Sequence, residues 1–230
     1  ERPDCLVWNT PHNPSGLILP SSLLEAARER VRSWGGHVIG DEHYRMLSSD
    51  TEALGPTAYS SGSNTFVTGS FIKCLGCSGL RIGWCVGDPD TLARMQSEKN
   101  YTTHVVNPIV EMIAVEVLRD MGSPLFETSR AEWRQNRAQL ERFLETSKAF
   151  YGAAPRGGLV TSLGYRGCPD LKTAHRYDQA LNDAGVLVLP LSAMEFGSVG
   201  GDATGHPLAR GLGVRLGLGA APSVFAAGLE

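Results

Sequence analysis

The chain has 230 residues, of which 42% are hydrophobic and 20% are charged, and its formal net charge at pH 7 is −3. This balance is typical of a folded globular protein and excludes a disordered or fibrous chain. The basic residues are scattered and no apolar run reaches about 18 residues, so the sequence predicts neither a nucleic-acid-binding surface nor a membrane-spanning helix.

The first half of the chain alternates short apolar runs with an amphipathic segment. Ser21 or Ser22 can cap the segment at its start, and Gly35-Gly36 can end it. In chain order, the pattern predicts strands at 5–9, 37–40, 65–71 and 80–86 and a helix at 23–34. Strand, helix and strand in this order, with turn residues at the strand ends, predict an α/β domain with a mainly parallel sheet.

The second half differs in character and predicts a smaller α+β domain. Met121-Gly122-Ser123-Pro124 breaks the pattern, so we place a large domain at 1–121 and a C-terminal domain at 122–230. The glycine-rich stretch 197–213 is expected to be a loop. The predicted helices are 91–100, 110–121, 129–150 and 172–184, and the predicted strands are 159–165, 186–191 and 214–218.

The five cysteines are an odd number and do not form a disulfide framework, so a reducing, cytoplasmic setting is expected. Cys74 and Cys77 form a CxxC pair, but a zinc site would need a second pair. The pair is therefore interpreted as two small residues in a tight loop, and no metal site is predicted.

Lys73 follows a predicted strand and is flanked by apolar residues, which predicts a buried lysine. Burial would lower the pKa of its amine and make the amine nucleophilic enough to form a Schiff base with an aldehyde. Ser70 lies three residues before Lys73, and Arg81 lies eight residues after it. A hydroxyl and a guanidinium beside one lysine predict a phosphate site.

Asp41 also follows a predicted strand, and ligands of such sheets bind at the carboxyl ends of the strands. A carboxylate at that depth needs a cationic partner, for which a protonated pyridine nitrogen is suited. Tyr44 lies three residues further on, and Asn13 ends the preceding strand. Both side chains could form hydrogen bonds with a phenolic oxygen on the same ring.

These residues resemble the fold-type I pyridoxal-phosphate-dependent aminotransferases, specifically class I/II. Asn13-Pro14-Ser15-Gly16 is similar to the NP[ST]G motif of the family, and Asp41-Glu42-His43-Tyr44 to its DxxY motif. The stretch from Ser70 to Lys73, followed by Gly79 to Trp84, is similar to SxSK and GxRxGW. Val214-Arg215-Leu216-Gly217 is similar to the arginine motif near the C-terminus of the family. The order and approximate spacing of the motifs agree over essentially the whole chain.

The resemblance implies a pyridoxal 5'-phosphate cofactor held on Lys73 by a Schiff base. Lys73 would be the catalytic residue, and it would move a proton at the substrate Cα. Arg215 would bind the α-carboxylate of an amino-acid substrate. The resemblance implies that the cofactor is bound by Asn13, Asp41, Tyr44, Ser70, Lys73 and Arg81. A homodimer is expected by analogy with the family.

Two features depart from the family pattern. Ile72 stands where the family usually has a small hydroxyl residue, which removes one donor near the phosphate. The NP[ST]G-like motif begins at residue 13, whereas it lies near the middle of the family's chains. We therefore expect this chain to be the C-terminal part of a longer enzyme. Its partner would be the N-terminal half of the same enzyme, and alone it should neither fold well nor catalyse.

Several functions stay open from the sequence. The first is an aminotransferase-like enzyme that acts on an α-amino acid. The second is a pyridoxal-phosphate enzyme that does not transaminate, catalysing elimination or the oxidation or cyclisation of an arginine-type side chain. The segment Gly69 to Gly76 faintly resembles the arginine-modifying enzymes of peptide-antibiotic biosynthesis, of the capreomycidine-synthase kind. The third is an aminotransferase-like ligand-sensing domain of a regulator, and the fourth is an inactive homologue.

Overall fold

The computed structural model describes the chain except residues 1, 49–56, 61–63, 121–123, 195–207 and 209. Contacts divide the chain into two compact units, each of which is described by itself. The first unit contains residues 1–12, 17–130 and 156–158, and the second contains residues 13–16, 131–155 and 159–230.

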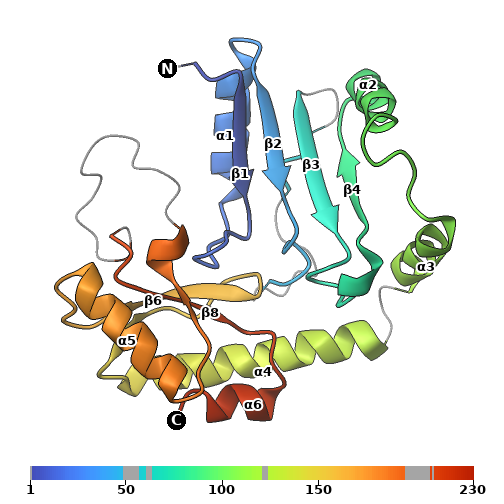
Figure 1. Ribbon diagram of the computed structural model, residues 1–230. Coiled ribbons are helices and arrows are strands. Elements are labelled where there is room, and N and C mark those ends of the chain that lie inside the picture. The colour runs from blue at the N-terminus through green and yellow to red at the C-terminus, as the bar shows by residue number, and fades with distance from the viewer. Residues whose placement is uncertain (1, 49–56, 61–63, 121–123, 195–207, 209) are drawn as a thin grey trace. The chain divides into compact units, whose positions relative to one another are not determined.

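The first unit is built on a four-stranded sheet in the order β1-β2-β3-β4 (Figure 1). Its strands are β1 (Cys5–Asn9), β2 (His37–Asp41), β3 (Thr65–Ser70) and β4 (Gly83–Val86). The first three strands are parallel, and β4 pairs antiparallel with β3. The expected α/β architecture is confirmed, with one antiparallel strand at the edge of the parallel set.

Helix α1 (Ser21–Arg32) connects the first two parallel strands and lies beside them (Figure 1). It buries Leu24 and Val31, and it ends before Gly35, whose positive φ of 78° suits glycine. The predicted serine cap is wrong: the N-cap residue is Pro20, and it makes no side-chain cap hydrogen bond. The helix begins at Ser21 itself, so both serines already belong to its first turn.

The connection from β3 to β4 is a compact loop followed by a short 3-10 helix, η1 (Ser78–Leu80). The predicted strand 80–86 begins only at Gly83, because Arg81 has a left-handed φ of 50° that a strand cannot contain. Phe71 and Leu75 of the loop pack with Ala114 and Phe126 in one apolar cluster. This cluster fixes the loop that carries Lys73.

Helices α2 (Pro89–Lys99) and α3 (Pro108–Arg119) follow the sheet. Each begins with proline directly after an N-cap residue whose side chain accepts a backbone N–H, Asp88 for α2 and Asn107 for α3. These caps explain why both helices start two residues before the predicted positions.

The second unit contains an antiparallel sheet in the order β5-β6-β8-β7. Two elements of this unit were not predicted, namely the strand at 150–152 and the helix at 222–227. The predicted strand 186–191 is reduced to two residues, followed by a short 3-10 helix. The strands are β5 (Phe150–Gly152), β6 (Val160–Tyr165), β7 (Leu189–Pro190) and β8 (Gly213–Gly217). The remaining elements are α5 (Leu171–Asp183), η2 (Leu191–Met194) and α6 (Pro222–Ala227).

Helix α4 (Pro124–Thr146) is the longest element, and the division between the units falls within it, between Arg130 and Ala131. The predicted boundary at 121–124 lies at the start of this helix, and residues 121–123 lie outside the described residues. The division into a large and a C-terminal domain therefore stays a prediction. Among the helices that the structure describes, none is long and apolar enough to cross a membrane.

The second half of α4 supplies buried side chains to the second unit. Leu140 is completely buried, and the amide nitrogen of Asn136 donates to the carbonyls of Leu218 (3.0 Å) and Ala220 (2.7 Å). These two hydrogen bonds connect α4 to the segment that follows β8. The helix thus supports the strand that carries Arg215.

Replacing Leu140 by alanine is expected to lower the free energy of unfolding by about 2–5 kcal/mol, because it removes buried methyl groups and leaves a cavity. The matched control is Leu187→Ala, since Leu187 is 90% exposed and should change stability by about 0.5 kcal/mol or less. Urea denaturation followed by circular dichroism measures both effects. Equal effects of the two substitutions would contradict the packing assigned to α4.

Candidate active site

The carboxyl ends of the parallel strands bring two of the predicted site residues to one edge of the first sheet. Asp41 is the last residue of β2 and pairs with Thr68 of β3, so Ser70 lies two residues further along the neighbouring strand. Ligands of α/β sheets bind at this edge. Asp41 is half-buried, and Ser70 is buried.

His43, for which no role is predicted above, connects these two side chains. Its Nδ1 lies 2.5 Å from the hydroxyl oxygen of Ser70, and its Nε2 lies 3.3 Å from a carboxylate oxygen of Asp41. The same carboxylate oxygen accepts the backbone N–H of His43 at 3.3 Å. One imidazole therefore contacts both residues. The signal for it is its position two residues after Asp41, in the turn that leaves β2.

Lys73 is exposed, so its predicted burial is wrong. The loop closes through a hydrogen bond of 3.0 Å from the Cys77 N–H to the Phe71 carbonyl. Phe71, Cys74 and Leu75 occupy its buried positions. The apolar residues around Lys73 therefore pack inward, while the lysine points outward.

Arg81 lies near the same edge because β4 pairs with the end of β3, where Ser70 opposes Gly83. The backbone N–H of Phe71 also donates to the carbonyl of Ile82 at 3.3 Å. Arg81 is exposed. No hydrogen bond or ion pair joins the side chain of Arg81 or Lys73 to another residue that the structure describes. Within the described part of the chain, both cations are available to an anionic ligand.

Asn13 and Arg215 lie together in the second unit. Arg215 is in β8, where it pairs with Ser162 of β6 and Leu189 of β7, and its Nη1 donates to the Asn13 side-chain oxygen at 3.3 Å. The turn that carries Asn13 lies against Thr161, whose hydroxyl donates to the carbonyl of Ala153 at 2.8 Å and is 3.4 Å from the carbonyl of Ser15. A guanidinium in this position is partly exposed and can bind a carboxylate.

Tyr44 is buried in the turn after β2. Gly158 lies so close to this side chain that a Cβ at Gly158 would be 3.2 Å from the Cβ of Tyr44. Five of the predicted site residues therefore belong to the first unit: Asp41, Tyr44, Ser70, Lys73 and Arg81. The other two, Asn13 and Arg215, belong to the second unit.

The CxxC pair has the structural role that the sequence indicated. The thiol of Cys74 donates to the His43 carbonyl at 3.0 Å, and the thiol of Cys77 donates to the Leu75 carbonyl at 3.2 Å. Burial raises the pKa of the Cys74 thiol to about 12, so it stays protonated at neutral pH. Among the described residues, no group of histidine, cysteine and carboxylate side chains could hold a metal ion.

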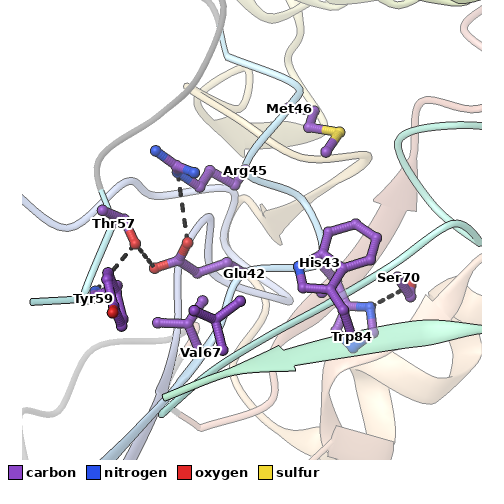
Figure 2. Close-up of a pocket in the computed structure, with 11 residues that line it drawn as sticks. Glu42, His43, Arg45, Met46, Thr57, Tyr59, Val67, Ser70 and Trp84 are labelled. Atoms are coloured by element: carbon purple, nitrogen blue, oxygen red, sulfur yellow. Dashed lines mark hydrogen bonds and ion pairs between the residues drawn. The ribbon is translucent and has the colours of Figure 1, made fainter. Parts of the chain in front are cut away.

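A cavity of about 300 Å³ is lined by His43, Ser70 and Trp84 and also by the buried Glu42. Figure 2 shows these side chains. One oxygen of Glu42 accepts from the Thr57 hydroxyl (2.9 Å) and the Ala58 N–H (2.7 Å), and the other is 3.5 Å from Arg45 Nε. These bonds anchor the segment 57–58 to the turn after β2.

The pH dependence of stability is expected to report Glu42. Burial raises the pKa of this carboxyl, although its hydrogen bonds and Arg45 oppose the shift. The folded chain then binds the proton more tightly than the unfolded chain, whose glutamates titrate near about pH 4.3. The free energy of unfolding therefore falls as the pH rises through the folded-state pKa.

The substitution Glu42→Gln removes this titration and keeps an acceptor for Thr57 and Ala58. We expect its stability relative to the wild type to improve steadily as the pH rises from acid to neutral, as measured by thermal denaturation at several pH values. Glu25→Gln is the control, since the Glu25 side chain is 69% exposed. A constant difference between Glu42→Gln and the wild type would contradict the assignment.

Comparison with known proteins places this arrangement in a family. The chain is 29% identical to capreomycidine synthase of Streptomyces vinaceus over 201 residues, which are 83% of this chain and 48% of the relative. It is 29% identical to the arginine–pyruvate transaminase AruH of Pseudomonas aeruginosa over 221 residues, which are 94% of this chain and 52% of the relative. The chain thus spans about half the length of these curated relatives.

Solved structures support the fold and the family. The PLP-dependent cyclase OrfR matches with a TM-score of 0.79 and 27% identity, covering 98% of this chain and 56% of that one. A PLP-dependent aminotransferase from Streptococcus suis matches in fold with a TM-score of 0.80 and 20% identity, covering 98% of this chain and 55% of that one. Both of these neighbours are described as PLP-dependent enzymes. The model of the family "Aminotransferase class I and II" matches residues 1–202, so the chain belongs to this family.

Proposed function

We propose that this chain is the C-terminal portion of a pyridoxal-phosphate-dependent, aminotransferase-like enzyme that acts on an α-amino acid. The observation that carries the proposal is the edge of the first sheet. A carboxylate (Asp41) and a hydroxyl (Ser70) lie there at the ends of neighbouring parallel strands. Lys73 lies in the adjoining loop and Arg81 directly follows η1, and neither has a side-chain partner among the described residues.

The side chains of the first unit fit the chemistry of pyridoxal phosphate. Ser70 and Arg81 can bind the phosphate, because a hydroxyl and a guanidinium both donate to anionic oxygens. Asp41 can pair with the protonated pyridine nitrogen, and the exposed amine of Lys73 can hold the aldehyde carbon through a Schiff base. When bound, the cofactor supplies an electron sink for the substrate Cα.

Each of these site residues would then have its own role in the reaction. Lys73 would take the proton from the substrate Cα and return it. Asp41 would keep its ring partner protonated, and Tyr44 with Asn13 would hold the ring oxygen. Arg215 would bind the α-carboxylate through two parallel hydrogen bonds, which would also orient the Cα–H bond for cleavage.

The names of the relatives favour an amino acid with a guanidino side chain as the substrate. One relative is an arginine–pyruvate transaminase, and another is the 3-methylarginine biosynthesis aminotransferase ArgM of Streptomyces arginensis, 28% identical over 133 residues. A second function stays open for the same substrate class, because capreomycidine synthase and the cyclase OrfR are equally similar. In that case the enzyme would cyclise the side chain instead of transferring the amino group.

We further propose that the active enzyme contains, besides this chain, the half of the family fold that this chain does not span. That assembly is called the assembled enzyme below. The family resemblance favours a homodimer and a cytoplasmic location.

The test is borohydride reduction of the assembled enzyme with stoichiometric pyridoxal phosphate, followed by peptide mass spectrometry. A cofactor-sized mass increase on the peptide that contains Lys73, and not on peptides with other lysines such as Lys148, is expected. An even distribution over the lysines would contradict the proposed site. In a ligand-sensing domain the same adduct would form without turnover of any amino acid.

Incubation of the assembled enzyme with arginine then separates the two enzymatic functions. Transamination would produce a 2-keto acid and the pyridoxamine form of the cofactor. Cyclisation needs a leaving group on the side chain, so 3-hydroxyarginine is incubated in parallel: loss of water as a guanidino nitrogen bonds to the side-chain carbon would give a cyclic guanidino amino acid and leave the cofactor as pyridoxal phosphate. Mass spectrometry of the small molecules distinguishes these products.

A further inference from the structure

His43 contacts both ends of the proposed cofactor site through one imidazole ring. Nε2 faces Asp41, which we assign to the pyridine nitrogen, and Nδ1 faces Ser70, which we assign to the phosphate. Figure 2 shows the contact with Ser70. This inference rests on the proposed function and adds a positioning residue to that site.

Whether the Ser70 hydroxyl can donate to a group other than His43 depends on the charge of the His43 ring. A hydroxyl has one donor and two acceptor positions. The backbone N–H of Ile72 donates to the Ser70 oxygen at 3.4 Å and occupies one acceptor position. The remaining acceptor position and the single proton are shared between Nδ1 of His43 and any phosphate.

The carboxylate of Asp41 can only accept, so Nε2 of His43 has to carry a proton. In the neutral ring, Nδ1 is then an acceptor, and the Ser70 proton points toward His43. In the charged ring, Nδ1–H donates to the Ser70 oxygen instead. The hydroxyl proton of Ser70 is thereby left for a phosphate oxygen.

We propose that His43 is a positioning residue whose protonation turns the Ser70 hydroxyl from a donor to His43 into a donor to the cofactor phosphate. The role matters in this chain because Ile72 supplies no side-chain hydroxyl next to Lys73. Ser70 is therefore the hydroxyl of this segment that is available to the phosphate.

Among the described residues, Asp41 is the charged group that contacts the His43 ring directly. Glu42 and Arg45 line the same cavity and pair with each other at 3.5 Å. The side chains that β3 and β4 contribute to the cavity are uncharged: Val67, Ser70, Trp84 and Val86. The segment 57–59 contributes Thr57 and Tyr59, and the thiol of Cys74 contacts only the backbone carbonyl of His43.

The experiment compares the affinities of the assembled enzyme for pyridoxal phosphate and for pyridoxal, which lacks the phosphate. Their ratio isolates the contribution of the phosphate, and it is measured from about pH 5.5 to about pH 8, where imidazoles lose their charge. Divided by the same ratio in a Ser70→Ala variant, which shows only the ionisation of the phosphate, the wild-type ratio is expected to fall about tenfold over this range, as for one hydrogen bond to a charged group.

Two variants serve as controls. In Ser70→Ala the hydroxyl is absent, so the ratio should be low throughout and show only the ionisation of the phosphate itself. In His43→Asn the amide can occupy the position of Nδ1 but does not titrate, so the ratio should follow the pH dependence of Ser70→Ala. The same pH dependence in His43→Asn as in the wild type would overturn the inference.

A second measurement needs no cofactor. In the assembled enzyme, with this chain labelled with 15N-histidine, the ring nitrogens of His43 are assigned by their loss in His43→Asn, and the neutral form should carry its proton on Nε2. A neutral form with the proton on Nδ1 overturns the inference. Failure of the wild type to bind pyridoxal phosphate at any pH refutes the proposed function instead, and the ring tautomer then decides the inference about His43 alone.

Discussion

Replacing Lys73 by alanine is expected to lower turnover of the amino-acid substrate at least about 10³-fold, because the positioned base at the substrate Cα is lost. The side chain is exposed and has no partner among the described residues, so its removal should cost little stability. Lys73→Arg should be as inactive as Lys73→Ala, since a guanidinium keeps its proton at neutral pH. Steady-state kinetics of the assembled enzyme measure both variants.

The control for Lys73 is Lys148→Ala, a substitution of an exposed lysine in the second unit. It should leave turnover and the borohydride adduct unchanged. In Lys73→Ala the cofactor should still bind through Asp41, Ser70 and Arg81, but without a covalent bond. Retention of turnover within tenfold of the wild type by Lys73→Ala would remove this lysine from the mechanism.

The parallel part of the first sheet could be predicted because each strand is a short apolar run bounded by turn residues. The predicted bounds of β1, β2 and β3 agree with the structure to within one residue at either end. The start of β4 could not be predicted, since the pattern does not reveal the left-handed backbone of Arg81. Strand β5 has only three residues and follows a long helix, and the predicted helix 129–150 included its first residue, Phe150.

The candidate site was predicted in its residue types and only partly in its environment. The spacing of strand ends predicts that Asp41 and Ser70 share an edge, and the register of β2 and β3 agrees. Its apolar neighbours predict a buried Lys73, but the loop buries Phe71, Cys74 and Leu75 while Lys73 faces outward. The role of His43 could not be predicted, because no local pattern shows that β3 brings Ser70 to its ring.

The second large effect is expected at Arg215. Arg215→Ala should lower kcat/KM for the amino acid about 10²- to 10³-fold, because the substrate carboxylate loses its charge-assisted hydrogen bonds. Arg215→Lys should recover only part of this loss, since an ammonium keeps the charge but not the planar fork. Cofactor affinity should stay close to that of the wild type. Arg210→Ala is the control, an exposed arginine of the same unit.

A substrate without the carboxylate separates binding of that group from general damage to the site. The wild type and Arg215→Ala should process the corresponding primary amine at equal, low rates, since the guanidinium has nothing to bind there. The contact of 3.3 Å with Asn13 adds a second readout, because residues in contact show non-additive effects when both are replaced. Asn13→Ala should therefore cost less in Arg215→Ala than in the wild type. Additive effects, or an equal loss of activity toward the amine, would mean that Arg215 supports the fold of β8 and does not bind the substrate.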